Sequence, residues 1–143
     1  MTTLASFNTR STLSDTSSTT RGIGAARRWI FEELKASSPR LQVSYDSYVV
    51  APQGRITRPV ELRNVMAVLP GRSARRIYVC GHYDSMSIGE QGQVLYNARL
   101  ASDTSRVDLQ LGAGFDHDGT APGANDDGSG TALTMELARV LAE

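Results

Sequence analysis

The amino-acid sequence predicts an α/β domain in which a mixed central β-sheet is flanked by helices. Residues 20–36 and 128–141 carry apolar side chains at the spacing of helices. Residues 41–50, 62–69 and 76–81 have the alternating or continuous apolar patterns of strands. Strands that lie between helical segments along the chain are typical of this class.

The composition is that of a globular chain. It has 143 residues, 40% of them hydrophobic, and its 15 basic and 15 acidic side chains give a formal net charge of zero. This hydrophobic content argues against disorder, and the lack of net positive charge argues against nucleic acid as a partner. No run approaches the roughly 18–20 apolar residues of a membrane-spanning helix.

The charge is distributed unevenly. Residues 1–80 carry 12 basic and 5 acidic side chains, whereas residues 81–143 carry 3 and 10. A carboxylate-rich half of a chain is a place to look for a cation site, and solvated faces are the alternative explanation.

Residues 1–20 form a segment of their own in this prediction, and residues 21–143 form the main domain. A short helix is expected within residues 1–10, around Leu4 and Phe7. Eight of residues 11–20 are Ser or Thr, which predicts a polar loop or, alternatively, a flexible tail.

Residues 20–36 have the pattern of an amphipathic helix. The apolar side chains recur one helical turn apart and should face the core: Ile23, Ala26, Ile30 and Leu34. Arg27 and Arg28 are expected on the solvated face. Ser37 to Pro39 should end the helix.

The three strand patterns differ in how much burial they predict. Residues 41–50 alternate apolar and polar side chains, which indicates a half-exposed strand, and a turn at residues 52–54 separates it from the strand at 62–69. Residues 76–81 are almost continuously apolar, as in a strand buried inside a sheet. Cys80, the single cysteine, lies in this run and is expected to be a small core residue.

The last third of the chain combines a long polar stretch with an apolar helix. Residues 86–125 contain six glycines and no clear periodicity, which indicates a loop insertion at about residues 88–120. Residues 128–141 are apolar on almost every side, so this helix is expected to be buried between other elements. Because these elements cannot easily cover it, we expect the chain to be the amino-terminal part of a larger domain that is incomplete at its carboxyl end.

His82 and Asp84 follow directly after the predicted buried strand. In an extended segment, residues two apart point the same way, so Asp84 can lie beside the imidazole of His82. A metal-bound histidine commonly donates its second ring N–H to a carboxylate. The same pair could serve as a general base, or could be a surface histidine beside a turn aspartate.

Asp126 and Asp127 directly precede the predicted helix at residues 128–141. Adjacent carboxylates in this position can cap the free N–H groups of a helix. Alternatively, one of them bridges two metal ions and offsets the repulsion between them.

Both motifs, in this order, resemble a known family of enzymes. Gly81-His82-Tyr83-Asp84-Ser85 and the later Gly123-Ala124-Asn125-Asp126-Asp127-Gly128-Ser129-Gly130 are similar to the motifs of the co-catalytic di-zinc aminopeptidases. These form metallopeptidase family twenty-eight, which includes bacterial leucyl aminopeptidases and aminopeptidase Y. Residues 64–71 and 29–34 resemble a strand and a helix of the same family.

The resemblance implies a role for each residue of the two motifs. His82 would ligate one Zn²⁺, Asp84 would orient His82, and Asp126 would bridge two Zn²⁺ ions. Asp127 is not expected to ligate, and the peptide bond between Asp126 and Asp127 is expected to be cis.

The implied function is that of a metallo-aminopeptidase. Such an enzyme hydrolyses the first peptide bond of a substrate with a free amino terminus, by a metal-activated water and a glutamate base. The remaining ligands and the base are expected after residue 143, so this segment alone should bind zinc weakly and be inactive. The resemblance favours a secreted or periplasmic location, although no signal peptide is visible, and it leaves the oligomeric state open.

Two other functions and one further ligand remain as alternatives. The chain could belong to a non-catalytic domain of the same fold, or to an enzyme similar to glutaminyl cyclases, which use a single zinc. Within the insertion, His117 either completes the metal site or lies in a polar turn.

Overall fold

The computed structural model describes residues 1–90, 92–94, 97 and 114–143, and these residues combine helices with short antiparallel sheets. The α/β class is therefore confirmed. The elements, in chain order, are α1 (Thr2–Ser6), α2 (Gly22–Ser37), β1 (Gln42–Val50), β2 (Val60–Val68), β3 (Ser87–Ile88), β4 (Phe115–Asp116), the kinked turn η1 (Ala124–Gly128) and α4 (Ser129–Leu141). None of the helices in the described part of the chain has the length and hydropathy needed to cross a membrane.

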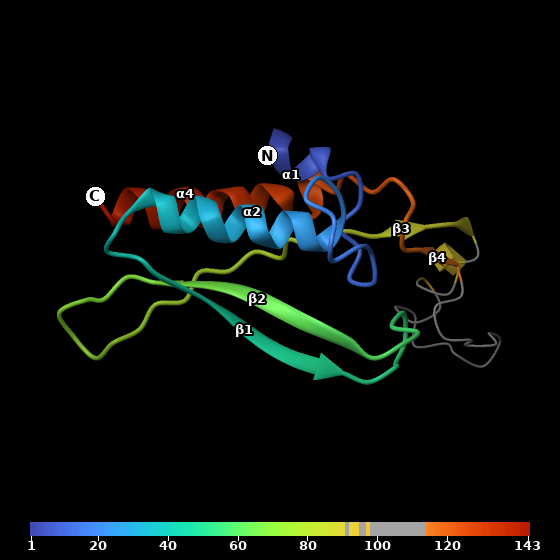
Figure 1. The fold of residues 1–143 in the computed structure, drawn as a ribbon, viewed down its shortest axis with the longest axis horizontal. Coiled ribbons are helices and arrows are strands. Elements are labelled where there is room, and N and C mark those ends of the chain that lie inside the picture. The colour runs from blue at the N-terminus through green and yellow to red at the C-terminus, as the bar shows by residue number, and fades with distance from the viewer. Residues whose placement is uncertain (91, 95–96, 98–113) are drawn as a thin grey trace.

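Helices α2 and α4 lie side by side above a long hairpin made of β1 and β2 (Figure 1). The hairpin is antiparallel, with Gln42 opposite Val68 at one end and Val50 opposite Val60 at the other. The predicted turn between the strands is present, and Gly54 adopts a positive φ of 55° there. Helix α2 contacts both strands, so the hairpin is half covered, as the alternation of its residues predicts.

Strands β3 and β4 form a second antiparallel pair at the two ends of the predicted insertion. Ser87 pairs with Asp116, and Ile88 pairs with Phe115. Most of the predicted insertion at residues 88–120 lies outside the described residues.

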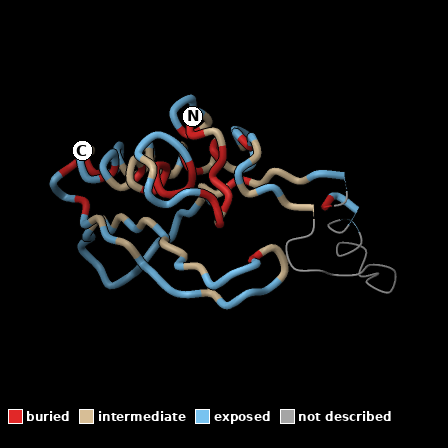
Figure 2. The backbone as a smooth tube through the Cα atoms, turned by 45° about the vertical axis from the view of Figure 1, so that its right-hand side comes forward, coloured by how far each residue is buried: buried red, intermediate tan, exposed pale blue. Residues whose placement is uncertain are grey.

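The core is formed mainly by α1 and α2 (Figure 2). Its buried side chains are Leu4, Phe7, Ala25, Ala26, Ile30 and Leu34. All four residues of the apolar stripe predicted for α2 are buried, which confirms the register of that helix. Partly buried side chains from the hairpin and from α4, such as Val65 and Met135, complete the cluster.

Residues 11–20 form a loop docked on the amino end of α2 rather than a flexible tail. The Ser14 hydroxyl accepts a hydrogen bond from the Ile23 N–H at 2.9 Å. Gly24 lets the loop approach closely, because a Cβ at this position would lie 2.2 Å from the Thr16 carbonyl oxygen. The guanidinium of Arg28 donates to the carbonyl oxygens of Thr16 and Ser17 at 2.9 and 3.3 Å, and also to that of Ser18.

The prediction that Arg27 lies on the solvated face of α2 is wrong. Its side chain is buried rather than solvated, and burial lowers its pKa. The helix face that carries Arg27 lies near Arg63 of the hairpin, whose positive charge lowers the pKa of Arg27 further. A basic residue next to an apolar stripe is covered when a sheet packs on that edge of the helix, which helical periodicity alone does not reveal.

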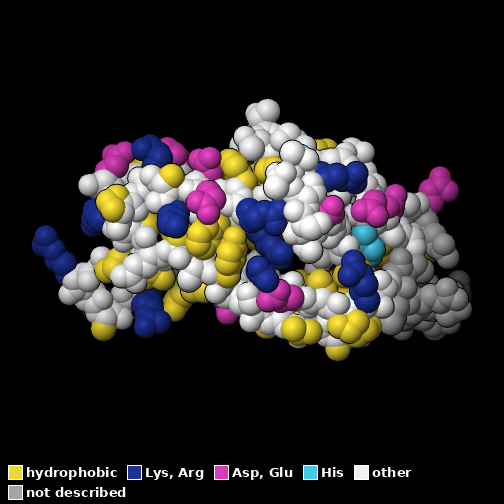
Figure 3. All heavy atoms as spheres, in the orientation of Figure 1, with side chains coloured by type: hydrophobic (Ala, Val, Ile, Leu, Met, Phe, Trp, Pro, Cys, Tyr) yellow, Lys and Arg dark blue, Asp and Glu magenta, His cyan; other side chains and the backbone are white. Residues whose placement is uncertain are grey.

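The prediction of a buried strand at residues 76–81 is wrong. Among the described residues no strand pairs with this segment, Ile77 is 91% exposed, and Cys80 is exposed rather than in the core. Helix α4 is likewise not enclosed: Thr131 is its only buried residue, and Leu133 is 68% exposed. Hydrophobic side chains also reach the surface over the helices and the hairpin (Figure 3). An apolar pattern shows that a segment favours burial, but neighbouring segments must supply the cover.

Candidate metal centre

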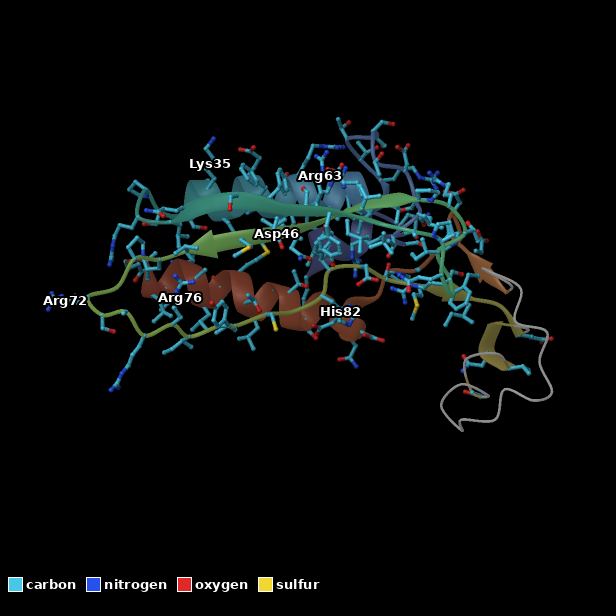
Figure 4. All side chains as sticks on the ribbon, turned by 90° about the horizontal axis from the view of Figure 1, so that it is seen from below. Lys35, Asp46, Arg63, Arg72, Arg76 and His82 are labelled. Atoms are coloured by element: carbon cyan, nitrogen blue, oxygen red, sulfur yellow. The ribbon has the colours of Figure 1, made fainter. Side chains whose placement is uncertain are left out.

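His82 lies beside the amino end of α4, at the end of an extended segment that runs along this helix (Figure 4). The approach is close: a Cβ on Gly81 would lie 2.7 Å from the backbone nitrogen of Thr131. Only glycine fits there without displacement of the backbone. The Thr131 hydroxyl donates to the His82 carbonyl oxygen at 3.0 Å and so fixes the segment on the helix.

The imidazole of His82 faces the carboxylate of Asp126. The distance from His82 Nε2 to Asp126 Oδ1 is 2.9 Å. Both side chains are open to solvent, with exposed fractions of 56% and 84%. The structure therefore brings together the two residues that the sequence predicts as metal ligands, although they are 44 positions apart in the chain.

Asp84 lies on the other side of the same imidazole. Its Oδ1 is 3.2 Å from His82 Nδ1, and its backbone oxygen is 3.3 Å from the same atom. The second carboxylate oxygen, Oδ2, accepts a hydrogen bond from the Arg55 guanidinium at 2.9 Å. Asp84 is thus held between a histidine and an arginine, which is the placement expected of a carboxylate that orients the ring.

Asp127 has a different role from its neighbour. Its Oδ1 accepts a hydrogen bond from the Gly130 N–H at 2.9 Å, and its Oδ2 accepts one from the His82 N–H at 3.2 Å. The peptide bond between Asp126 and Asp127 is cis, as the family resemblance implies. The two interpretations of this pair therefore apply to different residues: Asp127 caps α4, and Asp126 is left facing the imidazole.

Tyr83 connects the first motif to the hairpin. Its hydroxyl donates to the Arg63 carbonyl oxygen at 2.5 Å. Burial raises the pKa of Tyr83 to about 12, so the phenol stays protonated at neutral pH. Successive residues of an extended segment point to opposite sides, so Tyr83 points away from the side of His82 and Asp84. Its contact with the hairpin therefore anchors the segment that carries these two residues.

Arg10 connects both motifs and was not predicted from the sequence. It is fully buried, and its guanidinium donates to carbonyl oxygens on both sides, those of Tyr83 at 2.6 Å and Pro122 at 2.6 Å among them. Burial lowers the pKa of Arg10, and the negative charge of Asp84 opposes this shift. Nothing in the local pattern around Arg10 signals this role, and Arg55 was missed for the same reason.

His117 has separate contacts. Its Nδ1 lies 2.7 Å from the Ser11 hydroxyl, and its carbonyl oxygen accepts a hydrogen bond from the Thr9 hydroxyl at 3.3 Å. Its Nε2 is buried with no hydrogen-bond partner among the described residues, and burial lowers the pKa of the ring. Within the described ranges, His117 is not part of any group of three or more metal-binding side chains.

The donor set suits zinc but is small. Imidazole nitrogen and carboxylate oxygen are common zinc ligands, and a carboxylate on the second ring nitrogen is the usual support. The described residues include no group of three or more His, Cys, Asp or Glu arranged to hold a metal ion. His82 and Asp126 thus fit a zinc site as two of its donors.

The chain matches a family model and several known proteins over the region that carries both motifs. Residues 64–143, which include both motifs, match the model of peptidase family M28. A probable zinc metalloprotease of Leptosphaeria maculans is 42% identical over all of this chain and 29% of its own length. Relatives with the same description from Pyricularia oryzae and Phaeosphaeria nodorum are 40% and 35% identical over 97% and 98% of the chain.

The chain therefore belongs to peptidase family M28. It spans only about a quarter of the length of these relatives, between 24% and 29%. No solved structure gives a significant match to the chain.

Proposed function

We propose that the protein is a zinc-dependent peptidase of the aminopeptidase type and that this chain supplies the first part of its metal site. The contact between His82 Nε2 and Asp126 Oδ1 at 2.9 Å carries the proposal, because it places a nitrogen and an oxygen donor at one accessible point. Membership of family M28 and relatives described as probable zinc metalloproteases support the same function.

Each residue of the site has a distinct part in this proposal. Asp84 accepts the Nδ1–H of His82 and thereby leaves the Nε2 lone pair free for a metal. Arg55 neutralises and aims the second oxygen of Asp84. Asp126 offers two oxygens, which suits a carboxylate shared between two zinc ions.

A zinc site of this kind acidifies a bound water and polarises the carbonyl of a peptide bond. The protein's own residues hold the two motifs in place and keep His82 in one tautomer. The preference for substrates with a free amino terminus rests on the resemblance to the aminopeptidases. It is the part of the proposal that needs its own test.

The test uses the full-length natural protein. Removal of metal by a chelator should abolish hydrolysis of peptides with a free amino terminus, and added zinc should restore it. His82→Ala and Asp126→Ala should each lower activity by at least about a hundredfold and reduce the bound zinc. Asp46→Ala, which removes an exposed carboxylate on the β1–β2 hairpin, is the matched control and should leave both unchanged.

Three outcomes would change this proposal. Normal turnover by the His82→Ala variant would refute the zinc site. Equal hydrolysis of peptides with acetylated and free amino termini would refute the aminopeptidase specificity but not the peptidase. One tightly bound zinc per chain, with cyclisation of amino-terminal glutamine, would favour an enzyme similar to glutaminyl cyclases.

A further inference from the structure

The amino-terminal segment contacts both metal-site motifs through one residue, Arg10. Arg10 Nε donates to the Tyr83 carbonyl oxygen at 2.6 Å, and Tyr83 lies between His82 and Asp84. On the other side, Arg10 Nη1 donates to the Pro122 carbonyl oxygen at 2.6 Å and Nη2 to that of Gly123 at 3.0 Å. One side chain therefore joins the segment before β3 to the segment that leads into η1.

The backbone of Arg10 makes a second link to the same two segments. Its N–H donates to the Ser85 hydroxyl at 2.9 Å, and its carbonyl oxygen accepts from the Ser85 N–H at 3.2 Å. The Ser85 hydroxyl in turn donates to the Ala121 carbonyl oxygen at 2.7 Å. The Ala121 N–H donates to the Asn8 carbonyl oxygen at 2.7 Å, which completes the connection to the amino-terminal segment.

The surroundings of the guanidinium are shaped closely around it. Arg10 is 0% exposed, and its Nη1 also donates to the Leu4 carbonyl oxygen at 2.8 Å. A Cβ on Gly123 would lie 2.9 Å from Arg10 Nη2, so a larger residue there would push against the side chain. Burial of a charged group is costly unless it is hydrogen-bonded, and each nitrogen of this guanidinium donates to at least one carbonyl oxygen.

We propose that Arg10 is a positioning residue that fixes the distance between His82 and Asp126 and thereby sets the affinity of the site for zinc. The inference rests on the proposed zinc site. The guanidinium is suited to this task because its donors point in fixed, coplanar directions and can reach several carbonyl oxygens together. The single ammonium of a lysine cannot span the same set.

Arg28 provides a matched control within the same chain. Its guanidinium also donates to carbonyl oxygens of the amino-terminal segment, those of Thr16, Ser17 and Ser18. Among the residues that the structure describes, Arg28 makes no hydrogen bond or ion pair with either metal-site motif. Arg10→Lys and Arg28→Lys therefore make the same chemical change in two arginines that bind backbone carbonyls, and only one of them touches the site.

The experiment measures zinc dissociation constants of the full-length protein by competition with a chromophoric chelator. Arg10→Lys should weaken zinc binding by about 10- to 100-fold, the range typical of residues that support metal ligands. Arg28→Lys should leave it within about twofold of the natural protein. The visible spectrum after replacement of zinc by Co²⁺ gives a second readout, and it should change in Arg10→Lys only, because it reports ligand geometry.

Equal zinc affinity and equal Co²⁺ spectra in the Arg10→Lys and natural proteins would overturn the inference. If Arg10→Lys does not fold, Arg10→Gln replaces it, because this change removes the guanidinium and keeps a planar side chain that can donate hydrogen bonds to fewer carbonyl oxygens. It should weaken zinc binding, and unchanged affinity would again overturn the inference. The His82→Ala variant separates the two proposals. Normal zinc binding by His82→Ala would refute the proposed zinc site. Weakened zinc binding in His82→Ala together with unchanged binding in Arg10→Lys would refute only the role of Arg10.

Discussion

The amino-terminal region and the site-bearing region of this chain are built in different ways. Residues 1–37 supply most of the buried apolar side chains, although they contain none of the residues predicted to do chemistry. The site-bearing region, residues 76–85 and 121–141, is far more exposed. Arg10 ties it to the amino-terminal region, and hydrogen bonds from Thr131 to His82 and from the His82 N–H to Asp127 join its two segments. The candidate metal ligands therefore lie on segments whose positions depend on polar contacts more than on apolar packing.

The largest expected difference concerns two isoleucines, one in each region. Ile30 is 4% exposed in α2, whereas Ile77 is 91% exposed. Ile30→Ala should lower the free energy of unfolding of the 143-residue chain by about 2–5 kcal/mol, because it leaves a cavity in the core. Ile77→Ala should change it by less than about 0.5 kcal/mol. Urea-induced unfolding measures both changes. An equal loss of unfolding free energy in the two variants would contradict the difference between the two regions.

A smaller effect separates the two adjacent aspartates of the site. Asp127→Ala removes the acceptor for the N–H groups of His82 and Gly130, so it should destabilise the metal-free chain by about 1–2 kcal/mol. Asp126→Ala removes a carboxylate that is 84% exposed and should change stability by less than about 0.5 kcal/mol. Thermal unfolding without metal is the measurement. A greater loss in Asp126→Ala would show that this residue, too, has a structural role.

The smallest effect is a dependence of stability on pH that comes from His117. Burial lowers its pKa from the ordinary value of 6.5, so the folded chain takes up this proton less readily than the unfolded chain. The stability present above pH 6.5 is therefore lost as the pH falls below that value and through the lowered pKa. His117→Asn should flatten the decline in stability below pH 6.5. An unchanged slope in this variant would mean that other groups cause the dependence.

Local patterns in the sequence were sufficient for part of the fold. The apolar stripe of α2 and the alternation in β1 arise from the geometry of one element and a single packed face, and the structure confirms both. The strand expected at residues 76–81 failed because pairing requires a neighbour, and the apolar run contains no information about one. Helix α4 is apolar on almost every side, and the other described elements do not cover it, as we expect from the sequence.

The site residues that form sequence motifs could be predicted. The single side chains that contact residues far away in the sequence could not. His82, Asp84 and Asp126 were found from their spacing and their resemblance to a family, and the structure brings them together. Arg10 donates to Pro122, 112 positions away, from a segment with no motif. Contacts at such separation depend on the assembled tertiary structure, so neither Arg10 nor Arg55 had a signal in the local pattern.

We propose that His82 and Asp126 hold the same zinc ion. X-ray data collected from crystals of the full-length protein on both sides of the zinc absorption edge test it most directly. We expect an anomalous peak in contact with both His82 Nε2 and an Asp126 carboxylate oxygen. A zinc peak that touches neither residue, or His82 without Asp126, would contradict it.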